Sequence, residues 1–167
     1  MYKTILVPLD QSQRAEAILP HVEELARCNN ARIVLVHVVE PVIMAVSYYG
    51  GQSEVDLILM DQMTRAATNY LDGVSEDLRM RGFDVTTRVV DGSTVDEILK
   101  TADEEKVDMI AMASHGRSGL SRMLHGSVAS GMLQHSKLPL LLIRSLDTTQ
   151  ESSRVESTTN ENEVAHA

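Results

Sequence analysis

The chain has 167 residues, of which 43% are apolar and 23% charged, a composition typical of a soluble globular protein with one sizeable core. The formal net charge of −9 argues against a broad surface for nucleic acid or anionic membrane. One cysteine, Cys28, allows no intramolecular disulfide, and the longest uncharged run, Pro41–Ser53, is too short to span a bilayer. Because the apolar run near the N-terminus is also too short for a signal peptide, we expect a cytoplasmic protein.

The first predicted strand is the apolar run Thr4–Leu9, which is followed by Asp10. Runs without polar alternation are typical of central strands in parallel sheets, because helices cover both faces. Pro8 cannot donate to a strand ladder, so we expect the pairing to end near Val7.

The next segment has the period of a helix. Ser12 can cap its start, and Asn29-Asn30 ends it. Pro20 lies inside the apolar stripe and should either kink the helix or lie near its first turns. The stripe consists of Ala15, Ile18, Leu19, Val22, Leu25 and Ala26.

The middle of the chain is predicted to continue the alternation. Ala31–Val39 is the second strand, and the Pro41–Ser53 loop after it, which holds two adjacent tyrosines, is either a surface loop or a flap over a ligand. Glu54–Arg81 has the pattern of a long helix that ends at Gly82. Val85–Val90 alternates with polar residues, which indicates a strand near a sheet edge.

The remainder gives two more helix–strand units and a tail. Thr94 and Glu97 form a capping-box pattern at the start of a helix, and Met109–Ala113 is the fourth strand. Ser127–Ser136 is the last helix and Pro139–Ile143 the fifth strand.

The C-terminal residues 147–167 are polar and acidic and contain no aromatic residue. We therefore expect a domain over residues 1–146 followed by a disordered tail.

Alternating strands and helices of these lengths predict an α/β fold, a five-stranded parallel doubly wound sheet with helices on both faces. The predicted strand order is 3-2-1-4-5, a Rossmann-like arrangement. In such sheets a ligand binds past the carboxyl ends of the strands, where the strand order reverses. That crevice would lie between Asp10 at the end of the first strand and Ala113 at the end of the fourth.

The loop after the fourth strand has features suited to phosphate. Gly116 and Gly126 would allow close approach of backbone amides to an anion. Ser127 is a good N-cap residue, and free N–H groups at a helix start favour negative charge. Glycines also mark ordinary strand–helix loops, so both interpretations stand on this pattern alone.

Three segments together resemble the universal stress protein family. They are Ile5–Asp10, Val36-His37-Val38, and the run from Ser114 to Ser127, in which Gly116 and Gly126 are separated by nine residues. The likeness covers about residues 2–145. The nucleotide-binding branch of that family is marked by G-x2-G-x9-G-[S/T], and here Ala113 replaces the first glycine. Alanine keeps the same backbone groups but places a methyl group against the sugar.

The resemblance implies a dimeric α/β protein that binds ATP, or AMP or ADP, with Mg²⁺ as a companion of the phosphates. By that likeness Asp10 and the Ala113 backbone hold the ribose, and the Val38 backbone meets the adenine edge. A main-chain donor and acceptor suit adenine, whose N1 accepts and whose N6 donates. The residues implied to contact the phosphates or to line the site are Pro8, Leu9, Gly116, Arg117, Gly126, Ser127 and Val128. Asp10 has an alternative interpretation, as a helper at the start of the following helix.

The sequence lacks the motifs of other nucleotide-binding proteins and of common hydrolytic enzymes. No P-loop string G-x4-G-K-[S/T] and no G-x-G-x-x-G fingerprint occurs, and no G-x-S-x-G elbow appears. A phosphoacceptor domain needs several acids at the carboxyl ends of the strands, whereas Asp108 precedes its strand. No His/Cys cluster has zinc spacing. We therefore expect ATP hydrolysis to be slow if present.

Two functions remain open from the sequence. The first is an ATP-binding regulatory or sensor protein of the stress response, acting with an unknown protein partner. The second is a dimeric interaction module of the same fold without a working nucleotide site. In both, an apolar edge strand is a pairing liability, so we expect a homodimer through the fifth strand. The residues expected in that interface are Leu140, Leu141, Leu142 and Ile143.

Overall fold

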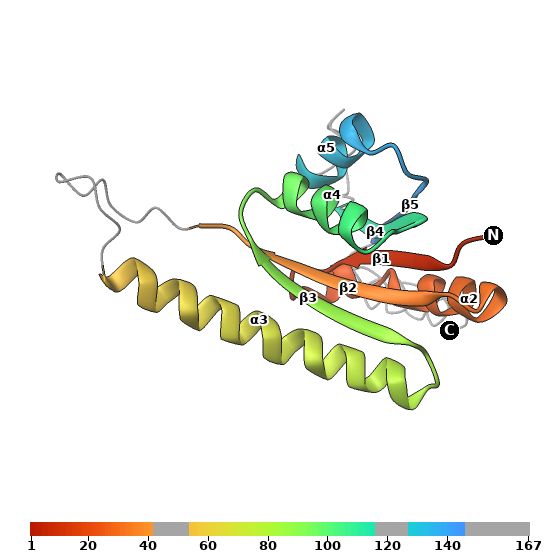
Figure 1. The fold of residues 1–167 in the computed structure, drawn as a ribbon, viewed down its shortest axis with the longest axis horizontal. Helices are drawn as coiled ribbons and strands as arrows, with labels where there is room; N and C mark the ends of the chain where they lie inside the picture. Colours follow the sequence, from red (N-terminus) through yellow and green to blue (C-terminus); the bar gives the residue numbers. More distant parts are fainter. Residues whose placement is uncertain (42–53, 116–126, 146–167) are drawn as a thin grey trace, which may run out of the picture.

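The computed structural model describes residues 1–41, 54–115 and 127–145, which form alternating strands and helices (Figure 1). The strands are β1 (Thr4–Pro8), β2 (Arg32–Val39), β3 (Val85–Asp91), β4 (Met109–His115) and β5 (Leu140–Ser145). The helices are α1 (Gln13–Glu16), α2 (Leu19–Asn29), α3 (Glu54–Met80), α4 (Thr94–Glu104) and α5 (Ser127–His135). The expectations for the loop over 42–53 and the tail over 147–167 fall outside these ranges, as do Gly116, Arg117 and Gly126.

The five strands of the described ranges form one parallel sheet in the order β3-β2-β1-β4-β5. This confirms the predicted Rossmann-like α/β fold. In the register, Ile5 of β1 pairs with Ile33 of β2 on one side and with Met109 of β4 on the other. The strand order reverses between β1 and β4, so the switch point lies where it was expected.

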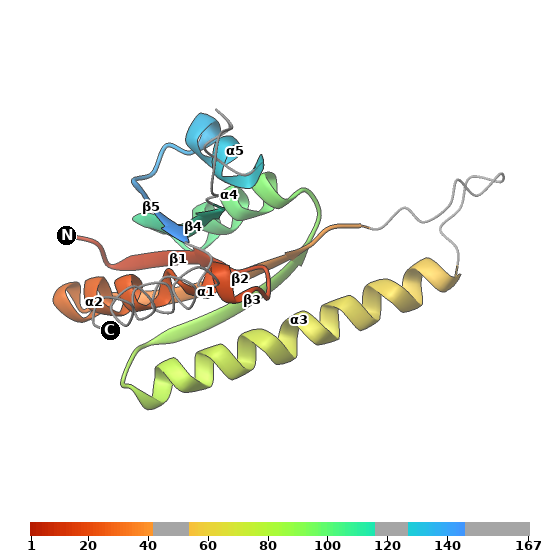
Figure 2. The same ribbon diagram turned by 180° about the vertical axis from the view of Figure 1, so that it is seen from behind.

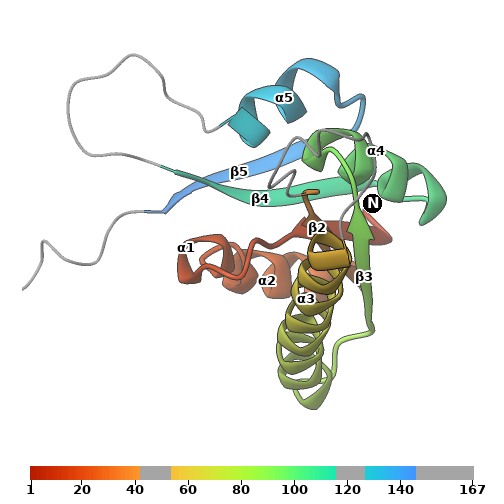
Figure 3. The same cartoon turned by 90° about the vertical axis from the view of Figure 1, so that its left-hand side faces the viewer.

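Helices cover both faces of the sheet, with α1, α2 and α3 on one face and α4 and α5 on the other (Figures 1, 2 and 3). The central strand β1 serves both cores: Ile5 and Val7 are buried with side chains of α2 and α3, and Leu6 is buried with side chains of α4 and α5. This two-sided burial explains why β1 is uniformly apolar. It also fixes the carboxyl end of β1 between the two helix layers.

The β1 ladder extends one residue further than predicted, because Pro8 pairs with Val36 of β2. The Leu9 N–H donates to the Val36 carbonyl at 2.9 Å, so position 9 faces β2. Since alternate residues face opposite neighbours, position 8 faces β4, where the β1–β4 pairing covers only Ile5 and Leu6. The missing N–H of Pro8 therefore costs no ladder bond.

The helix predicted after Ser12 is two helices. The Ser12 hydroxyl accepts from the Ala15 N–H and caps α1, which ends after four residues. Pro20 lies in the first turn of α2, where its absent N–H has no helical partner to lose. Asn30 ends α2 in the left-handed conformation, with φ of 51°. Pro20 thus begins a second helix.

The ends of α3 and α4 show one prediction that is confirmed and one that is wrong. After α3, the Gly82 N–H donates to Arg79 O and the Phe83 N–H donates to Leu78 O, the Schellman pattern that requires the positive φ of Gly82. At α4 the predicted capping box does not form. Ser93 is the N-cap residue without a side-chain capping bond, and the Thr94 hydroxyl donates to the Glu40 carboxylate.

The last two strands differ slightly from their predicted bounds. β4 continues past Ala113 because Ser114 and His115 pair with Arg144 and Ser145 of β5. Pro139 precedes β5, although its carbonyl accepts from the Ile110 N–H at 3.0 Å. β5 is an edge strand of the described sheet.

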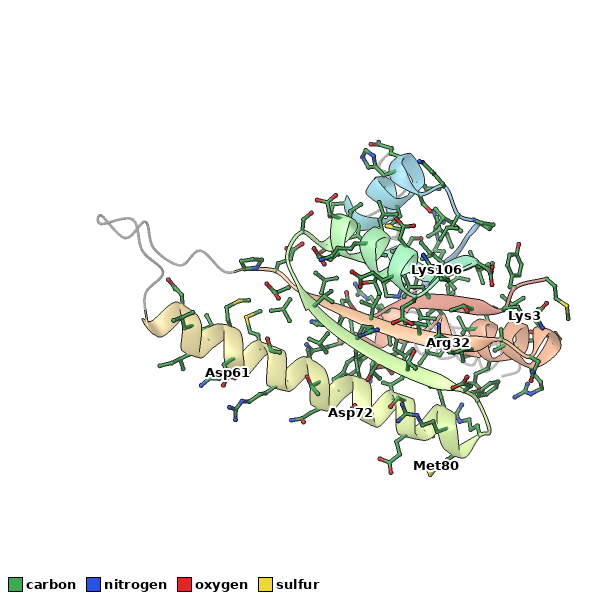
Figure 4. All side chains as sticks on the ribbon, viewed as in Figure 1. Lys3, Arg32, Asp61, Asp72, Met80 and Lys106 are labelled. Carbon is green, nitrogen blue, oxygen red and sulfur yellow. The ribbon has the colours of Figure 1, made fainter. Side chains whose placement is uncertain are left out.

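The long helix α3 extends past the sheet at its N-terminal end (Figure 1). Ala67, Leu71 and Leu78 are buried against the sheet, whereas Asp61 and Asp72 are exposed (Figure 4). Within the described ranges, none of the helices is long and apolar enough to cross a membrane.

Candidate functional site

A cavity of about 450 Å³ lies at the carboxyl ends of β1, β2 and β4, beside the starts of α4 and α5. Seven of the ten residues predicted for the site line it: Pro8, Leu9, Asp10, Val38, Ala113, Ser127 and Val128. The other three, Gly116, Arg117 and Gly126, fall outside the described residues. The two strand ends expected to face each other therefore border one cavity.

Asp10 lies in the turn between β1 and α1. Its Oδ1 accepts from the Ser12 N–H at 3.1 Å and from the Ser12 hydroxyl at 2.6 Å. Ser12 in turn accepts from the Ala15 N–H at 3.1 Å. These contacts support the alternative interpretation, in which Asp10 helps to start the following helix. Both contacts use the same carboxylate oxygen, so they leave a ligand-binding role for Asp10 open.

The end of β2 forms the next wall of the cavity, through Val36, His37, Val38, Val39 and Glu40. His37 is half-buried, and its Nδ1 lies 2.8 Å from the Leu9 carbonyl oxygen. Val38 packs against the core beneath α4 and α5. Met63 of α3 also lines the cavity.

The end of β4 and the start of α5 also line the cavity. Ala113 pairs with Ile143 of β5, and the Ser114 hydroxyl donates to the Ile143 carbonyl at 3.2 Å. That hydroxyl is therefore used within the sheet. Ser127, the first residue of α5, is exposed at the cavity, and the first turn of α5 contains no acidic residue.

The start of α4 borders the same cavity but has different surroundings. Thr94 binds the Glu40 carboxylate, and Asp96 and Glu97 lie in the first turn of α4. Acidic groups near a helix N-terminus neutralise the partial positive charge of its free N–H groups. Between the starts of α4 and α5, that of α4 has carboxylates in its first turn and that of α5 has none.

A hydrogen bond between Tyr70 of α3 and Glu16 of α1 joins these two helices. The Tyr70 hydroxyl donates to Glu16 Oε1 at 2.8 Å. Burial, followed by this hydrogen bond and the negative charges of Glu16 and Asp10, raises the pKa of Tyr70. Tyr70 therefore stays protonated and serves as a structural donor that holds α1, and the Asp10 turn before it, against α3.

The acid expected to lie away from the site is Asp108. Asp108 lies at the amino end of β4, where it accepts from the Lys3 N–H at 2.7 Å and the Thr4 N–H at 2.9 Å. These two backbone donors hold the pKa of Asp108 below its usual range. Asp108 is therefore at the opposite end of the sheet from the cavity, as expected. Among the described residues, no three His, Cys, Asp or Glu side chains gather as a metal site.

Sequence reasoning missed several cavity residues. Glu40 is an acidic residue directly after a buried strand. The same feature identified Asp10 and could have identified Glu40. Met63 lies within the predicted helix Glu54–Arg81, but its position relative to the strand ends depends on how that helix packs. His37 was noted only as part of the Val-His-Val segment, without a role.

A sequence profile of the universal stress protein family matches residues 1–144 of this chain. The chain belongs to the universal stress protein family. Universal stress protein MJ0577 of Methanocaldococcus jannaschii is 31% identical over 155 residues, covering 86% of this chain and 96% of that protein. The solved structure of MJ0577 has a TM-score of 0.75 at 32% identity and covers 89% of this chain and 99% of that one. A universal stress protein family member from Burkholderia pseudomallei has a TM-score of 0.64 at 28% identity, covering 85% and 96%.

More distant solved structures share the fold of this universal stress protein. A family member from Arabidopsis thaliana with AMP bound has a TM-score of 0.58 at 17% identity, covering 89% of this chain and 94% of that one. A universal stress protein from Archaeoglobus fulgidus in complex with dAMP has a TM-score of 0.55 at 22% identity, covering 85% and 98%. At such low identity the likeness shows a shared fold. The bound AMP and dAMP are ligands of those two proteins.

Proposed function

We propose that this universal stress protein binds an adenine nucleotide, with ATP as the preferred ligand, and acts as a regulatory or sensor protein in the stress response. The observation that carries the proposal is the single cavity bordered by Asp10, Val38, Ala113 and Ser127. Its volume falls within the range of small-molecule sites. Two distant family members have been solved in complex with AMP and with dAMP, which supports an adenine nucleotide as the class of ligand.

The residues that line the cavity suit the base and the ribose of the nucleotide. Val38, Met63 and Met112 give apolar surface for the base, and the Val38 backbone supplies the donor and acceptor that suit adenine. Asp10 at the end of β1 would accept from ribose hydroxyls, and the Ala113 backbone would meet the sugar from β4. The methyl group of Ala113 narrows that side relative to glycine.

Electrostatics favour one direction for the bound nucleotide. The carboxylates around the start of α4 disfavour phosphate there, whereas the start of α5 carries no acid in its first turn. The phosphates would therefore lie at Ser127, and Pro8, Leu9 and Val128 would line the cleft. By the family resemblance, Gly116, Arg117 and Gly126 would also contact the phosphates. Mg²⁺ would be held by the phosphates, because the described residues offer no protein cage for it.

We propose a binding function with slow turnover, if any, rather than efficient hydrolysis. The Ser114 hydroxyl donates to the Ile143 carbonyl, and the two ring nitrogens of His37 lie against the Leu9 carbonyl and the Gln11 side-chain amide, so these contacts within the protein occupy both candidate groups. Occupancy of the site by ATP would then be the regulatory signal, read by a protein partner in the cytoplasm.

The direct test is calorimetric titration of ATP, ADP and AMP into nucleotide-stripped protein and into Gly126→Val. We expect the wild type to bind ATP and the variant to lose binding while keeping its melting temperature, because a branched side chain would fill the phosphate position. The proposal would be refuted if the wild type showed no ATP binding at ATP concentrations up to about 1 mM, where even weak binding is detected. Equal binding by Gly126→Val would show that the phosphates lie elsewhere.

A dimer through β5 is the second part of the proposal. Leu141 and Ile143 are half-buried against the core beneath α1, α2 and α3, and Leu140 and Leu142 against the other core. A second β5 paired antiparallel would complete the burial and satisfy the free strand edge. Leu141→Arg should give a monomer by light scattering, and an unchanged dimer mass would refute this interface. A dimer that never binds nucleotide would favour the interaction-module alternative.

A further inference from the structure

The His37 side chain joins the end of β2 to the turn that carries Asp10. Its Nδ1 lies 2.8 Å from the Leu9 carbonyl oxygen. A carbonyl only accepts, so the Nδ1–H of His37 donates to it, which fixes the neutral ring as the Nδ1-protonated tautomer. The Leu9 N–H at the same time donates to the Val36 carbonyl at 2.9 Å. Both polar backbone groups of Leu9, the residue before Asp10, are therefore held by β2.

The residue after Asp10 is held from the same side. Gln11 has a φ of 66°, a left-handed conformation that a residue with a side chain adopts only when its surroundings impose it. Its Nε2 lies 3.4 Å from His37 Nε2, and because an amide NH₂ only donates, the bare ring nitrogen accepts. One imidazole thus contacts the residues on both sides of Asp10.

We propose that His37 is a positioning residue, which sets where the Asp10 carboxylate stands against the ribose of the bound nucleotide. The inference rests on the proposed adenine-nucleotide function and assigns a role to a side chain that was not among the predicted ligand contacts. Through Asp10, and through the Ser12 groups that bind Asp10 Oδ1, the imidazole controls the mouth of the cavity beside β1.

The chain offers a conservative and a disruptive variant at this position. In His37→Asn the amide nitrogen occupies a place like that of Nδ1 and can still donate to Leu9. In His37→Phe the ring keeps its shape but has no donor. The probes are ATP and 2′,3′-dideoxy-ATP, which lacks the hydroxyls that Asp10 would bind.

We expect His37→Phe to weaken ATP binding about threefold to tenfold, the loss of one positioning hydrogen bond, and His37→Asn to restore most of it. Dideoxy-ATP should bind His37→Phe and wild type alike, and Asp10→Ala should show the same ligand dependence as His37→Phe. Equal weakening of both ligands by His37→Phe would overturn the inference, because His37 would then act on another part of the ligand. Wild-type binding that does not distinguish the two ligands would also overturn it.

A measurement on the ligand-free protein separates this inference from the proposed function. The Ser12 amide is bonded to Asp10 Oδ1, so its hydrogen exchange reports the position of Asp10. Exchange at Ser12 should be faster in His37→Phe than in the wild type and in His37→Asn. If the wild type binds no ATP, the proposed function fails while this exchange result still decides the positioning role. Unchanged exchange in His37→Phe would overturn that role.

Discussion

Helices α4 and α5 lie on the same face of the sheet and begin at the same cavity, yet their first turns differ in charge. The start of α4 has the Glu40 carboxylate on Thr94 and has Asp96 and Glu97 in its first turn. The start of α5 has Ser127 exposed and no acid in its first turn. Two comparable positions in the fold therefore differ in the charge that surrounds the free N–H groups of the helix. On the proposed function, this difference in side-chain charge, and not the topology that the two helices share, would determine where the phosphates bind.

Ionic contacts fix α4 at its far end. At the far end of α4, Glu105 accepts from the Arg88 guanidinium at 2.7 Å and from Arg32 at 2.9 Å. Arg32 lies at the amino end of the sheet with Lys3 and Lys106 (Figure 4). Ionic contacts thus tie α4 to β2 and β3, which makes it a fixed wall of the cavity.

The largest expected effect comes from giving α5 the charge of α4. Ser127→Glu should weaken ATP binding by at least about tenfold, because a carboxylate would repel the phosphates and neutralise the helix start. Ser127→Gln, with the same size and no charge, is the matched control and should lose much less. Titration of both variants checks this. Equal losses would mean that bulk rather than charge is responsible.

A smaller effect concerns the ionic contacts of α4 and the stability of the fold. Hydrogen bonds from Arg88 and then Arg32 hold the pKa of Glu105 below its usual range. Its carboxylate therefore stabilises the fold above the unfolded pKa of about 4.3, and this contribution is lost as pH falls through the folded pKa.

Glu105→Gln should accordingly lower the free energy of unfolding at pH 7 by about 1 kcal/mol, since the partners Arg32 and Arg88 are partly exposed. Urea unfolding as a function of pH measures this. The difference between variant and wild type should shrink below about pH 4. A difference that stays constant into acid would contradict the assignment to the Glu105 charge.

The smallest effect is expected from removing a carboxylate at the start of α4. Glu40→Gln should tighten ATP binding by about twofold and leave adenosine binding unchanged, because only the phosphates feel the exposed charge. Asp72→Asn, which removes one charge on the outer side of α3, is the control (Figure 4). Tightening of the same size in both variants would assign the effect to net charge.

Much of this contrast could be predicted from the sequence. The parallel doubly wound sheet followed from the alternation of strands and helices. Alternation alone does not determine the strand order, but given the order 3-2-1-4-5, Asp10 and Ala113 were expected at facing strand ends. The glycine-bearing motif placed Ser127 at a helix start. These features depend on local pattern and on general rules of α/β topology.

What the sequence could not supply depends on contacts between distant elements. Thr94 and Glu97 have the pattern of a capping box, but the Thr94 hydroxyl binds Glu40, which lies 54 residues away. The β1 ladder was expected to end near Val7 and ends one residue later, at Pro8, because the backbone nitrogen of Pro8 faces β4. The contact of His37 with Leu9 likewise follows from β1–β2 pairing and from no local pattern.

The most direct test of the central claim is amide NMR of the ligand-free protein titrated with ATP and, separately, with adenosine. We predict that ATP shifts the amide resonances of Ser127, Val128 and Ala129 at the start of α5, whereas adenosine leaves them largely unmoved. Both ligands should shift Val38, and neither should shift the α4 amides of Thr94 and Val95 strongly. Phosphate-dependent shifts at the start of α4, with α5 unaffected, would contradict the account.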